Sequence, residues 1–218
     1  MSHSAQSRYF PPADTADRHG IVAVGGKLDS DWIVDAYRHG IFPWPTGDGW
    51  LAWWSPDPRG IIEFADLHIS QRLARTIRSG RFQVTRDQDF AGVIDGCATA
   101  QDREEETWIT STMREAYVRL HGEGIAHSVE VWHEGQLAGG IYGLSIGGLF
   151  AGESMFYRVS DASKVALVHL VEHLRQQGFA LFDVQMVTAH TRSMGAKTIS
   201  RRAYLRRLAA AVDMGIRF

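Results

Sequence analysis

Three strand-like segments follow one another in the middle of the chain, and they constrain its fold more than any other feature. The segments are rich in β-branched, aromatic and small residues, and they cover residues 127–133, 136–145 and 149–156. Glu134-Gly135 and Gly147-Gly148 separate them and have the composition of short hairpin turns. The pattern predicts three strands joined by hairpins.

A long helix and a further strand are expected after these hairpins. Apolar residues recur at helical spacing from Leu167 to Leu174, within a segment that covers residues 161–177 and ends at Gly178. Residues 180–186 have the composition of a strand. Hairpin-linked strands followed by a helix and another strand predict an α+β fold around a mixed sheet.

The first 64 residues differ in composition from the rest. Residues 40–59 hold four Pro and four Trp, so they predict an ordered loop rather than a helix or a central strand. A short helix is expected from about Ser30 to Gly40. We therefore expect a small irregular N-terminal lobe over residues 1–64 and a second domain over residues 65–218.

Capping and turn residues predict the remaining elements of the second domain. Helices are expected at 70–79, at 89–98, from a capping box at Thr112–Glu115 to about His121, and after Ser200. Residues 82–87 are expected to form a strand.

Composition narrows the classes of function. The 218-residue chain has a formal charge of −2, which argues against a protein that coats long stretches of nucleic acid but not against one that grips an RNA end. Cys97 is the only cysteine, so no disulfide framework is expected. Neither a signal peptide nor an 18-residue apolar run is present, and we expect a cytoplasmic protein.

Two short motifs point to other enzymes. His169, Glu172 and His173 fit an inverted zinc-protease pattern, but only Asp183 and Asp213 remain downstream as carboxylates, which favours a solvated helix face and no metal. Residues 175–180 fit the pyrophosphate loop of acetyl-CoA-dependent acetyltransferases. Here the glycine follows a helix, so carbonyls rather than amides would face the phosphate.

Three polar residues are candidates for a site. Asp183 and Gln185 lie two apart on the expected strand and should project from one face, either as a structural pair or toward a ligand. Glu153 is flanked by small residues and strand formers, and its carboxylate either faces solvent or meets a cationic ligand.

The chain is also rich in tryptophan. Core packing and the stacking of a nucleobase are both open for the cluster formed by Trp44, Trp50, Trp53, Trp54 and Trp108.

Taken together, the segments resemble the leucyl/phenylalanyl-tRNA–protein transferases. The resemblance runs in order over nearly the whole chain, through GIFPW (40–44), WWSPDPR (53–59), LHIS (67–70), TWIT (107–110), HSVEVW (127–132), GGIYG (139–143), LFAGESMF (149–156), DASKVAL (161–167) and SMGA (193–196). WWSPDPR and GESMF are the most specific of these blocks. Val184 stands where the family more usually has Cys, and Met194 where Leu is common.

The resemblance implies a GNAT-like (acyl-CoA N-acyltransferase-like) domain behind the small lobe. It also implies the transfer of Leu or Phe, and less well Met, from aminoacyl-tRNA to the N-terminal α-amine of proteins that begin with Arg or Lys. Such proteins are then degraded by the N-end rule. Because the ester is already activated, no metal, coenzyme A or ATP is implied.

The resemblance assigns roles to individual residues. Asp183 and Gln185 would be the catalytic pair, and Glu153 would supply negative charge. Trp44 and Trp108 match positions that contact the terminal adenosine. We expect the amino-acid side chain to bind a pocket lined by Ile141, Phe150, Met155 and Phe182.

Two groups of arginines are candidates for contact with the tRNA acceptor stem, although solvated helix faces explain them equally well. They are Arg72, Arg75 and Arg78 on one expected helix, and Arg201, Arg202, Arg206 and Arg207 on the last.

Overall fold

A mixed seven-stranded sheet forms the centre of the protein. The structure is a computed structural model and describes residues 6–46, 48–100 and 107–218. The strand order is β10-β4-β9-β8-β7-β6-β5, in which β8 and β9 run parallel and the other neighbours run antiparallel. The strands are β4 (Arg59–Ile62), β5 (Gln83–Arg86), β6 (Ala126–His133), β7 (Gln136–Ile146), β8 (Leu149–Tyr157), β9 (Leu181–Gln185) and β10 (Lys197–Ile199). The predicted α+β fold with a mixed sheet is confirmed.

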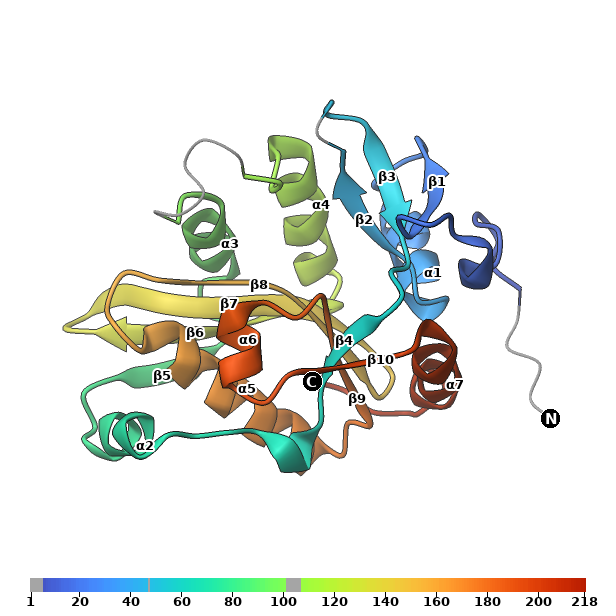
Figure 1. Cartoon of the computed structure of the whole chain (residues 1–218). Coiled ribbons are helices and arrows are strands. Elements are labelled where there is room, and N and C mark those ends of the chain that lie inside the picture. Colours follow the sequence, from blue (N-terminus) through green and yellow to red (C-terminus); the bar gives the residue numbers. More distant parts are fainter. Residues whose placement is uncertain (1–5, 47, 101–106) are drawn as a thin grey trace.

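Helices cover both faces of this sheet (Figure 1). One apolar core lies beneath α1 (Ser30–Arg38), α3 (Phe90–Ala98) and α4 (Ser111–Gly122), and the other lies beneath α5 (Ala162–Gln177). The predicted stripe from Leu167 to Leu174 is buried against the sheet, as its helical spacing requires. The remaining helices are α2 (Gln71–Arg78), α6 (Ala189–Ser193) and α7 (Arg201–Ala211), with short 3₁₀ turns at Ala13–Thr15 and Phe64–Asp66. No helix in the described ranges is long and apolar enough to cross a membrane.

The tryptophan-rich segment forms strands, so the predicted loop over residues 40–59 is wrong. A three-stranded antiparallel sheet has the order β1-β3-β2, with β1 at Ile21–Val24, β2 at Phe42–Pro45 and β3 at Leu51–Trp54. The proline-rich strand β2 is at the edge of this sheet, where the missing N–H groups of Pro43 and Pro45 break no second ladder. The central strand β3 contains no proline.

Two further details differ from the expectations. Strand β4 pairs with β9 and β10 in the large sheet although it lies within residues 1–64, so the boundary between lobe and second domain stays a proposal. Helix α4 begins after Thr110, whose side chain accepts the N–H of Met113, rather than at the predicted capping box at Thr112. The predicted caps Ser70 and Ser200 are confirmed, and the structure shows that Asp89 caps α3.

Candidate active site

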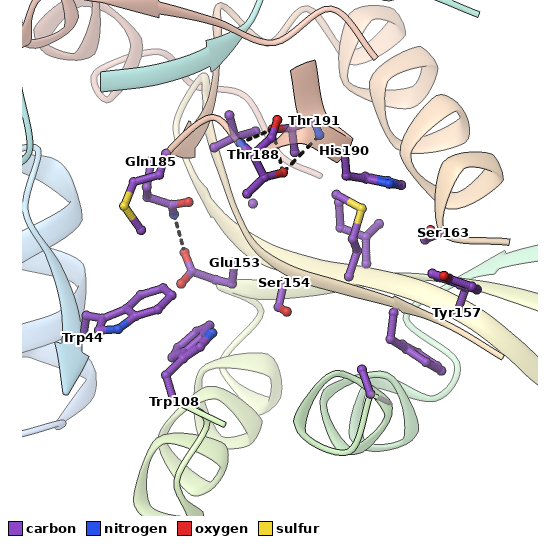
Figure 2. A pocket seen from close by; sticks show the side chains of 17 residues that line it. Trp44, Trp108, Glu153, Ser154, Tyr157, Ser163, Gln185, Thr188, His190 and Thr191 are labelled. Atoms are coloured by element: carbon purple, nitrogen blue, oxygen red, sulfur yellow. Dashed lines mark hydrogen bonds between the residues drawn. The ribbon is translucent and has the colours of Figure 1, made fainter. Parts of the chain in front are cut away.

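A cavity of about 360 Å³ opens where strands β8 and β9 separate. The parallel ladder between them joins Leu149–Ala151 to Leu181–Asp183, and both strands continue past it. Glu153 and Gln185 lie just beyond the ladder and line the cavity. Figure 2 shows these two residues at one end of the cavity, together with Trp44 and Trp108. His190, Ser163 and Tyr157 lie at the other end.

The side-chain amide of Gln185 is held against Glu153. Its Nε2 donates to Glu153 Oε1 at 3.0 Å, while its main-chain N–H donates to Asp183 Oδ1 at 2.9 Å. Gln185 has a φ of 50°, in the left-handed region that few side chains adopt. The register with β4 shifts here, because Ile61 pairs with Asp183 and the next position, Gly60, pairs with Gln185. Strand β9 therefore bulges at Val184, and the bulge aims Gln185 into the cavity.

Glu153 is a buried carboxylate that accepts hydrogen bonds from two tyrosines. Tyr37 of α1 donates to Oε1 at 2.8 Å and Tyr117 of α4 donates to Oε2 at 3.0 Å. Burial raises the pKa of Glu153 to about 7, although both tyrosine hydrogen bonds act to lower it. Burial and the nearby carboxylate also raise the pKa of both tyrosines well above the ordinary value, so they remain donors. The carboxylate is thus poised between its two ionisation states at neutral pH.

Asp183 is fully buried and is paired with an arginine. Arg59 donates from Nε to Oδ1 at 2.9 Å and from an Nη atom to Oδ2 at 2.6 Å, and Tyr204 of α7 donates to Oδ2 at 2.8 Å. Burial alone would lower the pKa of Arg59, but the charge of Asp183 outweighs it and the pKa is raised. The carboxylate of Asp183 therefore contacts the main-chain N–H of Gln185. This carboxylate is not part of the cavity wall.

The other predicted site residues fall into two groups. Trp44 and Trp108 line the cavity and stack on each other, with ring centroids 4.4 Å apart and an interplanar angle of 21°. Ile141 and Met155 also line it. Phe150 and Phe182 are not among the lining residues; like Ile141 they belong to the core beneath α5, and each is 1% exposed.

Sequence reasoning did not identify four residues that hold the site together, Arg59, Tyr37, Tyr117 and Tyr204. Arg59 is the last residue of the WWSPDPR block. The block indicated that this residue is important, but it did not indicate that Asp183 is its partner. The tyrosines occupy ordinary positions in amphipathic helices, so their hydroxyls gave no signal.

The two alternative motifs have structural explanations. Within the described ranges, no group of three His, Cys, Asp or Glu residues could hold a metal ion. His169 and His173 are partly buried rather than fully solvated, and the ring of His173 packs edge-on against Phe218. Gly178 ends α5 in the left-handed conformation, as expected for a helix C-terminus rather than a phosphate loop.

The arginines of the two candidate clusters are partly paired. Arg72 binds Asp161, Arg207 binds Glu63, and Arg201 donates to the carbonyl of Ser55. Within the described part of the chain, the exposed arginines of these two clusters that make no ion pair are Arg75, Arg78, Arg202 and Arg206. Contact with tRNA stays a prediction for both clusters.

Comparison with known proteins identifies the family. The family model for leucyl/phenylalanyl-tRNA protein transferase matches residues 61–209, and the model for the N-terminal domain of that family matches residues 26–57. The leucyl/phenylalanyl-tRNA–protein transferase of Pseudomonas putida (strain W619) is 52% identical over 206 residues, which cover 94% of this chain and 91% of that protein. The protein of the same name from Syntrophobacter fumaroxidans (strain DSM 10017 / MPOB) is 54% identical over 201 residues, covering 92% and 86%.

Solved structures give a weaker likeness. A ribosomal-protein-alanine N-acetyltransferase from Brucella melitensis biovar Abortus 2308 aligns at a TM-score of 0.38 and 16% identity, over 63% of this chain and 97% of that chain. The sequence relatives and the two family models agree along nearly the whole chain, and the chain therefore belongs to the leucyl/phenylalanyl-tRNA–protein transferase family.

Proposed function

We propose that this transferase moves Leu or Phe, and less efficiently Met, from aminoacyl-tRNA to proteins that begin with Arg or Lys. The acceptor is the N-terminal α-amine, and the product enters N-end rule degradation in the cytoplasm. The observation that carries the proposal is the hydrogen bond from Gln185 to Glu153, which lies in the cavity at the same end as Trp44 and Trp108 (Figure 2).

Each part of the cavity has a task in this reaction. The outer surface of the Trp44–Trp108 stack suits the terminal adenine. Ile141, Met155 and Val184 would contact the side chain of the transferred amino acid. Such a wall accepts Leu, Phe and Met, whereas the branched Cβ of Ile or Val would clash with it.

The chemical step is aminolysis of the ester. The α-amine nitrogen attacks the ester carbonyl carbon, the new C–N bond forms, the bond to the 3′-oxygen of adenosine breaks, and the amine proton is transferred, overall, to that oxygen. The pKa of an α-amine in a peptide is ordinarily about 8, so a useful fraction is neutral at pH 7 and positioning supplies much of the acceleration.

Three residues would support this step. Gln185 would hold the amine or the carbonyl, and Glu153 would place negative charge beside the cationic acceptor or the donor's amine. Asp183 would act as a positioning residue through the main chain of Gln185 and through Arg59. The ester needs no further activation, so the proposal includes no metal or coenzyme.

The test is an assay of peptide extension. The protein is incubated with Leu-tRNA and otherwise identical peptides that begin with Arg, Lys or Ala, and mass spectrometry should detect an added Leu only on the first two. Gln185→Ala should reduce the rate at least about tenfold, because one positioned group is lost at the reacting centre. Gln136→Ala, which alters an exposed glutamine on β7, is the matched control and should keep full activity. Equal extension of all three peptides would refute the acceptor specificity.

A further inference from the structure

Trp50 is the most exposed of the large aromatic residues, and no step of the proposed reaction uses it. Its side chain is 67% exposed, whereas Trp53 is fully buried and Trp44 stacks on Trp108. Within the described part of the chain, the ring of Trp50 stacks on no other ring. Removing such a side chain costs the core little, so packing does not explain a tryptophan at this position.

The hairpin geometry places Trp50 on the same side of the small sheet as Trp44. Trp44 pairs with Ala52, and partners across a ladder project to the same face. Trp50 precedes Ala52 by two residues and therefore shares that face. Hydrogen bonds from Thr46 N to Trp50 O at 2.8 Å and from Trp50 N to Thr46 Oγ1 at 3.2 Å extend the pairing to this position.

The two tryptophans form successive aromatic platforms. Diagonal neighbours in an antiparallel pair have backbones about 7–8 Å apart. Ala52, which lies opposite Trp44 and two residues after Trp50, contributes only a methyl group. Successive bases of a single strand bind such a row of rings by stacking, and they do so with little dependence on sequence.

We infer that Trp50 stacks on the nucleobase that precedes the terminal adenosine of the donor RNA. This inference rests on the proposed function, because it takes the Trp44–Trp108 stack as the adenosine site. Trp50 then adds a second binding position outside the cavity and makes the donor site at least two nucleotides long. An aminoacyl-adenosine would leave this position empty.

The charge of the hairpin favours a base over a phosphate. Residues 42–54 contain no Lys or Arg, and their only charged residue is Asp48. A phosphate contact would need a cation and would show the salt dependence of counterion release. Stacking on Trp50 should instead strengthen binding by a factor that is nearly the same at low and high salt.

The experiment compares two stable donor analogues, an adenosine with a 3′-amide-linked Phe and the same compound extended by one 5′-cytidylate. Trp50→Ala should weaken binding of the longer analogue by roughly 5- to 150-fold, the range for one stacked base, and leave the shorter one unchanged. Trp50→Phe should retain most of the affinity. Val24→Ala, which removes a 61% exposed apolar side chain from the other edge of the same sheet, is the matched control and should bind both normally.

Three results would overturn the inference. They are equal effects of Trp50→Ala on both analogues, no effect on either, and a raised KM for the acceptor peptide with unchanged donor binding, which would assign the surface to the acceptor protein. The variant Trp44→Ala distinguishes a failure of the Trp50 inference from a failure of the proposed function. If that variant binds the shorter analogue normally, the adenosine site itself is misplaced, whatever Trp50 does.

Discussion

Replacing Asp183 by alanine would leave the guanidinium of Arg59 in the interior without its carboxylate. Asp183 accepts two hydrogen bonds from Arg59, one from Tyr204 and one from the main chain of Gln185. The side chains of Arg59 and Asp183 are only 1% and 0% exposed, so water does not reach the orphaned charge. Breaking a buried pair in this way costs about 3–5 kcal/mol.

This cost is large beside the total stability of a domain, about 5–15 kcal/mol. Urea unfolding should therefore show a much lower midpoint for Asp183→Ala at an unchanged m-value. Gln185→Ala is the matched comparison, because its side chain makes one hydrogen bond to Glu153 and its loss should cost only about 1 kcal/mol. The double variant Arg59→Met/Asp183→Leu should regain part of the loss, because an apolar pair leaves no buried charge while the N–H of Gln185 and the hydroxyl of Tyr204 still lack their acceptor.

The reasoning would be refuted by an Asp183→Ala protein whose free energy of unfolding lies within about 1 kcal/mol of the wild type. The reasoning would also fail if the double variant were less stable than either single variant. The loss of the Arg59–Asp183 ion pair would then not explain why Asp183→Ala is destabilised. Activity of Asp183→Ala is informative only after this measurement, because loss of the fold and loss of catalysis both lower transfer.

Three further outcomes are expected. The pKa of Glu153 is raised to about 7 from 4.5, so the folded chain keeps a proton that the unfolded chain has lost. Its contribution to stability should be full below about pH 4.5 and be lost as the pH rises through 7, and urea titrations of Glu153→Gln should lack this slope. Arg206→Glu should weaken binding of whole aminoacyl-tRNA, with a shallower salt dependence, and spare the adenosine analogue. Metal analysis of wild type and His169→Ala should find no stoichiometric zinc, and a chelator should leave the transfer rate unchanged.

Local periodicity predicted the elements whose burial follows a regular pattern. Strands β6, β7 and β8 are long and are separated by short glycine-containing turns, and the apolar residues of α5 keep helical spacing over two turns. The positions of these elements could therefore be predicted from local sequence. Strands β2 and β3 were not predicted because each has four residues and β2 contains two prolines. Only their place in a sheet, with β2 at the edge, makes that composition acceptable.

The candidate site was predictable in its polar residues but not in its connections. Spacing singled out Asp183, Gln185 and Glu153 as polar groups on strands. Their partners are remote in sequence: Tyr37 lies 116 residues from Glu153, and Arg59 lies 124 residues from Asp183. No local pattern encodes such pairs. The pocket for the amino-acid side chain stays a prediction, and of its four residues Ile141 and Met155 line the cavity. Phe150 and Phe182 do not line the cavity and are buried in the core beneath α5, a core that also includes Ile141.

The two polar residues of β9 depend on each other through the backbone. A left-handed φ at a residue other than glycine costs on the order of 1–3 kcal/mol, so Gln185 needs surroundings that fix it. Asp183 provides part of them, because its Oδ1 accepts the N–H of Gln185 at the bulge, and Arg59 in turn fixes the carboxylate. Arg59 belongs to β4, the strand that pairs with this part of β9, so the ion pair joins the two strands where their register shifts. Fixed in this way, the amide of Gln185 points at Glu153 before any substrate binds, and the cost of orienting it is met by folding rather than by the reaction.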